Sequence, residues 1–437
     1  MASPPASEPA PPTALERQVV ILVMLIQLVN VFDFVMVMPL GQDFARSLAI
    51  PESQLGLIGG SYTFAAAVAG LLGARFLDRF DRRPALTIAM LGLVTATAAG
   101  GLAQGLGSMM AARIAAGAFG GPATSLSLAI IADVVPPARR GRALAVVMVA
   151  FPIASTLGIP LALTMANAGS WRTPFFAVAV FGVLITLFTV ARLPSLRGHL
   201  AGERKVATPT MALLRRPEMV MTIGAAAAMT FSVFMIVPFV RTFLENNYGY
   251  PPGRIALLYT VGGVAAFVVV RFTGRIVDRV GSAPVATFGT ALLCACIAIG
   301  FVPAQPIVPV MLVFVLFMCT ASLRGVPLST LASKLPAPHE RAQYMSLQSA
   351  TQHLSSSLGA VVASQVLAAS PARVVLWAGR PWLRMGGPLR HMPTVAIVSA
   401  GLAMAMPFLL WRVERRLKAR PPAVPVVAVS APVGELG

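Results

Sequence analysis

The sequence predicts an all-α integral membrane protein whose twelve transmembrane helices form two six-helix halves related by a pseudo-two-fold axis. Three observations predict this fold: an apolar composition, twelve apolar runs of membrane-spanning length, and two loop motifs that recur about 200 residues apart. Of the 437 residues, 57% are hydrophobic and only 11% are charged, whereas about 25% are charged in a typical soluble domain. This composition excludes a soluble enzyme, a disordered protein and a nucleic-acid-binding protein.

Each apolar run is long enough to cross a membrane as a helix, because a hydrocarbon core of about 30 Å needs about 20 helical residues. The runs are apolar on all sides, whereas the strands of a transmembrane β-barrel would alternate between apolar and polar residues. In chain order the runs are 18–40, 54–74, 85–105, 108–132, 143–166, 173–191, 219–240, 255–272, 284–303, 307–331, 343–368 and 393–411.

These runs divide the chain into five parts. We expect a disordered N-terminal tail over 1–17, a six-helix bundle over 18–192, a cytoplasmic linker over 193–218, a second six-helix bundle over 219–412 and a cytoplasmic tail over 413–437. The first residues have no basic segment and no small-residue cleavage site, so the first run is expected to be a retained helix and not a signal peptide.

The distribution of basic residues predicts the orientation. If the N-terminus is cytoplasmic, 24 Lys and Arg residues fall on the cytoplasmic side, 8 fall outside and 2 lie within the runs. Because basic residues accumulate in cytoplasmic loops, we expect a multi-pass membrane protein with both termini in the cytoplasm. The net charge of +19 would then anchor the protein to anionic lipid. Four arginines do not follow this distribution, because they lie in one predicted external loop: Arg373, Arg380, Arg384 and Arg390.

Two loops repeat at nearly the same offset. Asp78, Arg79 and Pro84 follow the second run, and Asp278, Arg279 and Pro284 follow the eighth. The segment 136–141 after the fourth run and 336–341 after the tenth both combine proline with arginine. Parallel repeats of six helices are typical of secondary transporters, which bind their substrate near the membrane midplane between the two halves.

These motifs carry a family resemblance. Residues 74–83 resemble the major facilitator superfamily signature Gly-x-x-x-Asp-Arg-x-Gly-Arg-Arg, with Ala74 and Asp81 at the two glycine positions. Residues 110–117 resemble the family motif of the fourth helix, and residues 155–160 followed by 169–172 resemble the fifth-helix pattern of its proton-driven exporters. The resemblance covers nearly the whole chain and extends in particular to the bacterial drug and sugar efflux permeases. It implies a location in the bacterial inner (plasma) membrane.

The resemblance implies a conformational latch at the cytoplasmic face. In the family, the signature aspartate caps a neighbouring helix and its arginine partner reaches an acidic residue at the end of the fourth helix, which Asp133 matches here. Ordinary cytoplasmic anchoring would explain the arginines but not the recurrence of Asp78 as Asp278. The expected latch residues are Asp78, Arg79, Arg82, Arg83, Asp133, Asp278 and Arg279.

Asp33 is the only acidic residue well inside any run. It lies six residues before Pro39, about 9–10 Å from the outer face at a helical rise of about 1.5 Å per residue. An unpaired carboxylate at this depth costs several kcal/mol, and Arg113 lies at a similar depth in a helix that the family fold places beside the first. We expect a proton-coupling pair, in which Asp33 takes up the proton and Arg113 responds to the loss of its charge. A permanent structural ion pair, or an Arg113 that extends alone to the surface, is the alternative.

Further polar residues are expected to line a substrate cavity, and two others to bend a helix. Arg324 suggests a cavity or gate position because charge within a membrane helix is costly, although it could extend to the cytoplasm. A polar stripe in the run 343–368 could equally be helix–helix contacts. The expected cavity residues are Asn30, Asp33, Arg113, Arg324, Gln348, Gln352 and His353, and the expected bend lies at Gly158 and Pro160.

The sequence therefore predicts a secondary active transporter that exports a drug, sugar or amphipathic metabolite against inward proton flow by alternating access. The alternative is an uptake symporter or facilitator for a nutrient or siderophore. An intramembrane enzyme is disfavoured because the four histidines have no ligand spacing, and a nucleotide-driven pump because no phosphate-binding loop occurs. We expect no cofactor and no metal site, and as partners protons, a small-molecule substrate and the lipid bilayer, with the protein a monomer.

Overall fold

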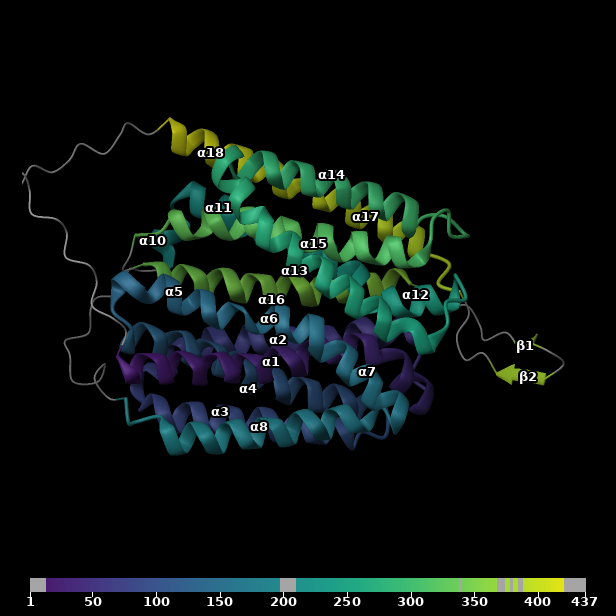
Figure 1. Cartoon of the computed structure of the whole chain (residues 1–437), viewed down its shortest axis with the longest axis horizontal. Coiled ribbons are helices and arrows are strands. Elements are labelled where there is room, and N and C mark those ends of the chain that lie inside the picture. Colours follow the sequence, from purple (N-terminus) through teal and green to yellow (C-terminus); the bar gives the residue numbers. More distant parts are fainter. Residues whose placement is uncertain are drawn as a thin grey trace, which may run out of the picture.

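A computed structural model describes most of the chain. It covers residues 13–196, 210–337, 340–367, 374–377, 380–383 and 388–419. Half of the predicted linker 193–218 and most of the two predicted tails therefore lie outside the described residues. The described chain is a bundle of long, roughly parallel and antiparallel helices (Figure 1).

The helices of the first half begin and end at recognisable signals. The hydroxyl of Thr13 accepts a hydrogen bond from the amide of Glu16 at the start of α1, and the carboxylate of Asp81 caps α3 at the amide of Arg83. The helices are α1 (Ala14–Ser47), α2 (Leu55–Phe76), α3 (Arg82–Gly101), α4 (Leu106–Val134), α5 (Pro137–Met148), α6 (Ala150–Ile153), α7 (Ile159–Ala168) and α8 (Arg172–Arg192). Between α6 and α7 runs η3 (Ala154–Gly158), a π-helical turn.

The second half follows the same plan. Its helices are α10 (Thr210–Leu214), α11 (Pro217–Ile236), α12 (Val240–Asn246), α13 (Ile255–Val280), α14 (Ser282–Gly300), α15 (Val310–Lys334), α16 (Arg341–Val366), α17 (Met392–Ala403) and α18 (Ala405–Lys418). A short antiparallel hairpin of β1 (Val374–Trp377) and β2 (Arg380–Leu383), which the sequence did not predict, lies in the loop between α16 and α17. The first and last long helices extend beyond their predicted apolar runs, α1 starting at Ala14 and α18 ending at Lys418.

Eleven of the described helical segments are long and apolar enough to span a membrane. The predicted run 343–368 is not among them, although it forms the 26-residue helix α16. Its serine, threonine and glutamine residues lower its hydropathy, but α16 packs against α2 and α11 inside the bundle. A helix covered by neighbouring helices needs less apolar surface than one that faces lipid.

The two halves meet along two pairs of helices. The helix α2 of the first half packs against α16 of the second, and α13 of the second half packs against α7 and η3 of the first. Both termini of the described chain lie at one end of the bundle, which we call the terminal end, and the opposite end is called the far end (Figure 1).

The buried apolar core joins the halves at the far end only, within the part of the chain that the structure describes. One large cluster contains residues from both halves, among them Leu40, Phe44, Phe239 and Phe243. Toward the terminal end the core divides into one cluster of the first half, which includes Leu22, and separate clusters of the second half. Because membrane helices associate through close van der Waals packing and interhelical hydrogen bonds, the shared cluster holds the halves together in this state at the far end.

Close helix contact within the first half depends on glycine. A Cβ atom at Gly117 of α4 would lie 2.2 Å from the carbonyl oxygen of Tyr62 on α2, and one at Gly121 would lie 2.3 Å from the carbonyl oxygen of Ala66. Small residues at this spacing allow membrane helices to approach closely. The approach brings the side chain of Tyr62 next to α4.

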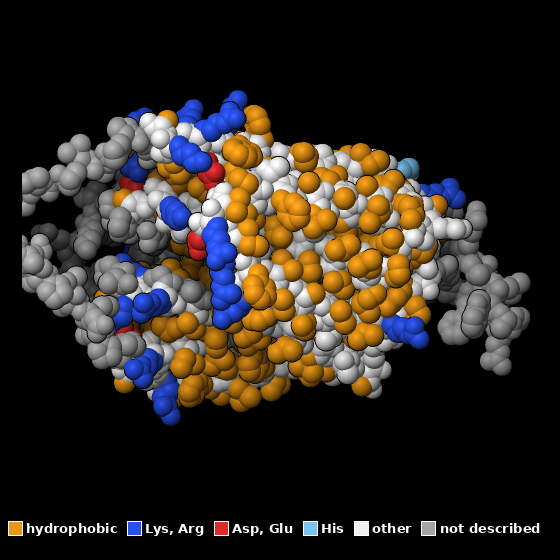
Figure 2. All heavy atoms as spheres, turned by 45° about the horizontal axis from the view of Figure 1, so that its top comes forward, with side chains coloured by type: hydrophobic (Ala, Val, Ile, Leu, Met, Phe, Trp, Pro, Cys, Tyr) orange, Lys and Arg blue, Asp and Glu red, His pale blue; other side chains and the backbone are white. Residues whose placement is uncertain are grey.

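The surface has a broad apolar band and a basic terminal end. Figure 2 shows hydrophobic side chains covering the middle of the visible face, with Lys and Arg side chains gathered toward the terminal end. Large exposed apolar residues such as Leu72, Ile88 and Phe288, each 64–65% exposed, are typical of contact with lipid hydrocarbon.

Candidate functional site

A fully buried ion pair lies within the first half. The carboxylate of Asp33 on α1 accepts hydrogen bonds from both terminal nitrogens of Arg113 on α4, at 3.0 Å from Nη1 and 2.8 Å from Nη2. Asp33 is 0% and Arg113 is 1% exposed. Removing one partner of such a pair typically costs about 3–5 kcal/mol, because the remaining charge is left buried. The structure thus brings together the two residues that the sequence singled out for coupling.

Three further side chains complete this site. The hydroxyl of Thr97 on α3 donates to Oδ1 of Asp33 at 2.8 Å. The guanidinium carbon of Arg113 lies 4.6 Å from the ring centroid of Tyr62, a cation–π contact. The hydroxyl of Tyr62 donates to Oδ1 of Asn30 at 2.5 Å. Together these contacts form one polar cluster, to which the four helices α1 to α4 contribute.

Asn30 connects this cluster to α4. Its amide nitrogen donates to the carbonyl oxygen of Gly120 and to the hydroxyl of Thr124, both at 2.8 Å. The sequence had suggested Asn30 as a cavity residue, whereas in the structure it is 5% exposed and its amide is engaged within the first half. Tyr62 and Thr97 were missed, because nothing in the sequence distinguishes them from other polar residues of membrane helices.

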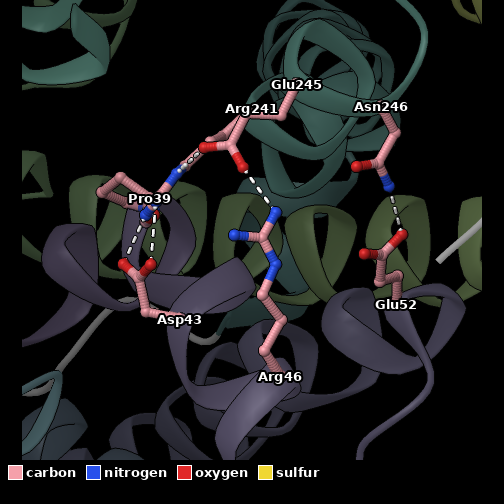
Figure 3. A network of polar contacts seen from close by, with 7 residues as sticks. All are labelled: Pro39, Asp43, Arg46, Glu52, Arg241, Glu245 and Asn246. Carbon is pink, nitrogen blue, oxygen red and sulfur yellow. Dashed lines mark hydrogen bonds and ion pairs between the residues drawn. The ribbon is translucent and has the colours of Figure 1, made fainter. Parts of the chain in front are cut away.

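A second polar network ties the two halves together at the far end (Figure 3). Arg241 of α12 donates to both carboxylate oxygens of Asp43 on α1, at 2.6 and 2.9 Å, and its Nε donates to Glu245 at 2.6 Å. It also donates to the carbonyl oxygen of Pro39. Arg241 is 4% and Glu245 is 5% exposed, so the fork geometry of the guanidinium satisfies carboxylates from both halves.

Two more contacts extend this network. Arg46 of α1 donates to Oε2 of Glu245 at 2.8 Å, and the amide of Asn246 donates to Oε2 of Glu52 at 2.6 Å. Asp43 and Glu245 were not among the residues that the sequence singled out. The sequence signal that could have predicted this network is the presence of acidic and basic residues at the same expected depth in opposite halves. We call the set Asp43, Arg46, Glu52, Arg241, Glu245 and Asn246 the far-end network.

The ion pairs described at the terminal end stay within one half. Nε of Arg82 lies 3.1 Å from Oδ2 of Asp133, and Arg83 donates to the carbonyl oxygen of Val190. Arg79 is exposed, and the side chain of Asp78 lies outside the described part of the structure. Of the expected latch residues, the structure therefore brings Arg82 and Asp133 together between α3 and α4.

The second copy of the loop motif is arranged differently. Asp278 and Arg279 at the end of α13 are both exposed, and the described residues provide them with no ion pair. The start of α14 is instead capped from a distance, because Glu414 of α18 accepts hydrogen bonds from the amides of Ser282 and Ala283 at 2.6 and 2.9 Å. An anionic cap of this kind is favourable at a helix N-terminus.

Arg324 does not join the buried ion pair. It is 0% exposed, and its Nη2 donates to the carbonyl oxygen of Ala403 at 3.3 Å. Ala403 ends α17, so the guanidinium lies at a helix C-terminus, where a cation is favoured. Gln348, Gln352 and His353 lie on α16 and are partly or largely buried, and their assignment to a substrate cavity stays a prediction.

The expected bend coincides with an irregular turn. Gly158 ends the π-helical turn η3, and Pro160 stands in the first turn of α7. A Cβ atom at Gly158 would lie 2.9 Å from the ring of Phe32 on α1. An apolar cavity of about 330 Å³ adjoins this turn and is lined by residues that include Phe32, Leu157 and Phe181. Single π-helical turns within α-helices occur frequently at functional sites.

Comparison with known proteins assigns this architecture to a family. Residues 23–360 match the model of the Major Facilitator Superfamily. A chloramphenicol resistance protein of Streptomyces lividans is 24% identical over 274 residues, which are 62% of this chain and 70% of that protein. The purine ribonucleoside efflux pump NepI of Shigella sonnei (strain Ss046) is 28% identical over 255 residues, which are 57% of this chain. The aligned part is 62% of the pump, less than two thirds of its length.

Solved structures share the fold. A bacterial homologue of the human lysosomal transporter Spinster, in an inward-facing and occupied conformation, superimposes with a TM-score of 0.72 at 15% identity, covering 95% of this chain and all of that one. A D-xylose–proton symporter gives a TM-score of 0.71 at 17% identity, covering 91% of this chain and 97% of the symporter. A point mutant of the nucleoside transporter NupG gives 0.67 at 15% identity, with 91% and 99% covered.

Proposed function

The chain belongs to the Major Facilitator Superfamily and is a multi-pass membrane transporter of small molecules, and we propose that it exports its substrate in exchange for protons. The observation that carries the proposal is the Asp33–Arg113 pair. Asp33 is an ionisable group at 0% exposure within a membrane helix, and its charge is balanced by one guanidinium. Ionisable residues inside membrane helices are costly and typically belong to ion or proton pathways.

The proposed cycle couples the charge of this pair to alternating access. Protonation of Asp33 removes the charge that Arg113 balances, and deprotonation restores it. A proton can therefore bind while the site is open to one side of the membrane and leave while it is open to the other. The resistance protein and the nucleoside efflux pump support export as the direction. The proposed substrate class is a drug, sugar or amphipathic metabolite.

We further propose that the terminal end faces the cytoplasm of a bacterial inner membrane. The Lys and Arg side chains gathered at that end support this orientation (Figure 2). In it, the continuous core and the far-end network close the outer side, so the structure corresponds to an inward-facing state. The Arg82–Asp133 pair would then belong to a cytoplasmic latch that joins the halves only when the protein opens outward, and the protein would act as a monomer.

Site-directed labelling tests the orientation. In a variant whose three cysteines are replaced by serine, single cysteines at Ser108 and Ser170 should react with a membrane-impermeant maleimide applied to intact cells. Single cysteines at Met211 and Lys418 should react only after the membrane is permeabilised. All four positions are exposed in the structure. Reaction at Met211 in intact cells would invert the topology.

Transport by the purified full-length protein tests the proposed function. In proteoliposomes with an acidic interior, addition of chloramphenicol or a purine ribonucleoside should lead to accumulation of the compound and a faster collapse of the pH gradient. A symporter would instead accumulate substrate when the outside is acidic, which would favour the uptake alternative. Transport that is unaffected by either gradient would exclude proton coupling.

A further inference from the structure

A stack of three aromatic rings leads from the buried ion pair to the other half of the protein. The ring of Tyr62, which lies against the Arg113 guanidinium, stacks on Phe34 of α1 with centroids 5.4 Å apart and an interplanar angle of 22°. Phe34 in turn stacks on Phe234 of α11, with centroids 5.9 Å apart and the same angle. Among the aromatic contacts described, the one between Phe34 and Phe234 joins the two halves.

Phe34 lies where the halves begin to separate. It packs both against the core cluster that crosses the halves at the far end and against the cluster confined to the first half. It also follows Asp33 directly in the chain. A displacement of Phe34 or Tyr62 would therefore change the packing at the place where the core shared by both halves ends and the core of the first half begins.

The charge state of Asp33 changes which contacts stabilise the guanidinium of Arg113. Among the described residues, the titratable groups facing Asp33 are Arg113 of α4 and Tyr62 of α2, and α3 contributes the hydroxyl of Thr97. Nε of Arg113 has no acceptor in the described structure. When Asp33 is protonated, Arg113 loses its anionic partner and keeps two contacts, a 3.5 Å hydrogen bond to the backbone carbonyl of Asp33 and the face of Tyr62. The contact with Tyr62 then gains importance, because cation–π attraction is strongest in a desolvated site.

We propose that Tyr62 and Phe34 are positioning residues that transmit the protonation of Asp33 to the contact between the halves, through the stack on Phe234. The inference rests on the proposed proton coupling and adds the route by which the coupling reaches the second half. It assigns the effect to the ring of Tyr62 and not to its hydroxyl, because the ring contacts both Arg113 and Phe34 whereas the hydroxyl bonds to Asn30.

The test measures opening of the far end as a function of pH. Spin labels at Ser170 of the first half and Gly253 of the second, both exposed, report the distance between the halves in nanodiscs. The wild-type distance distribution should shift over a pH series, and Asp33→Asn should abolish the shift. If the wild type shows no shift, the proposed function itself fails.

Given that shift, the variants test the stack. Tyr62→Leu and Phe234→Leu should each reduce the pH-dependent change in the open-to-closed ratio by roughly three- to tenfold, the range expected for losing one cation–π or aromatic contact. Tyr62→Phe should retain most of the change, and Phe288→Leu, which removes a lipid-exposed ring of the second half, should retain all of it.

Two results would overturn the inference. One is a wild-type pH response in Phe234→Leu or Tyr62→Leu. The other is a Tyr62→Phe variant as defective as Tyr62→Leu, which would assign the effect to the hydroxyl. Phe234 is only half-buried, so its variant is expected to fold even if Tyr62→Leu does not.

Discussion

Replacement of Asp33 by Asn is expected to abolish proton-driven accumulation while substrate exchange between the two sides of the membrane continues. The amide keeps the shape of the side chain and an oxygen that can accept from Arg113, but it cannot take up or release a proton. In proteoliposomes the accumulation ratio should fall to about one, and counterflow of labelled substrate should persist, because only proton coupling is removed. Asp33→Glu should retain partial accumulation with a changed pH profile.

A matched control for this variant lies on the same helix. Glu16 near the start of α1 is 6% exposed and pairs with Arg139 at 2.7 Å, so Glu16→Gln also removes a paired carboxylate from α1. That variant should still accumulate substrate, because its ion pair is at the terminal end and away from the buried cluster. If Asp33→Asn also builds a gradient, the Asp33–Arg113 pair is structural.

Replacement of Arg241 by Gln is expected to open the far end. The change leaves Asp43 and Glu245 without the guanidinium that they share, and the hydrogen bond to the carbonyl oxygen of Pro39 is lost as well. Breaking a buried pair costs about 3–5 kcal/mol. The side chain of Asp43 is 25% exposed, so we reduce the figure for solvent screening to about 2–3 kcal/mol. The population open at the far end should therefore rise by roughly 30- to 150-fold, since about 1.4 kcal/mol corresponds to a factor of ten.

Distances between spin labels at Ser170 and Gly253 measure this shift. Arg172→Gln is the matched control, because Arg172 is an arginine of the far end whose side chain donates to the carbonyl oxygens of Gly101 and Ala103 within the first half. Its loss should lower thermal stability without separating the halves. An unchanged distance distribution in Arg241→Gln would mean that the apolar core alone holds the far end closed.

The helices and the position of Asp33 were predictable because each depends on local sequence. A run of about 20 apolar residues is enough to predict a membrane helix, and two loops that repeat about 200 residues apart predict two halves. The depth of Asp33 follows from its distance to Pro39 at a fixed rise per residue, and Arg113 was the cation expected at that depth. The pair found between them is therefore a consequence of depth and helix order.

The contacts of polar residues depended on packing that no local pattern encodes. The hydropathy of α16 is too low for it to count among the candidate membrane spans. It nevertheless lies inside the bundle, because α2 and α11 pack against it. Asp278 is exposed, and the cap of the helix that follows it comes from Glu414 of the distant helix α18.

The sequence by itself determined that this protein is a duplicated bundle of membrane helices with one carboxylate, that of Asp33, well inside an apolar run, since hydropathy, repeats and helical rise are properties of short segments. The tertiary structure alone decided which charges face each other across the halves. Asp43 and Arg241 are 198 residues apart in the chain, and their contact exists only because the far ends of α1 and α12 share one apolar core. Ion pairs form where packing removes water and brings opposite charges within about 4 Å, and the path of the chain through the bundle decides where that occurs.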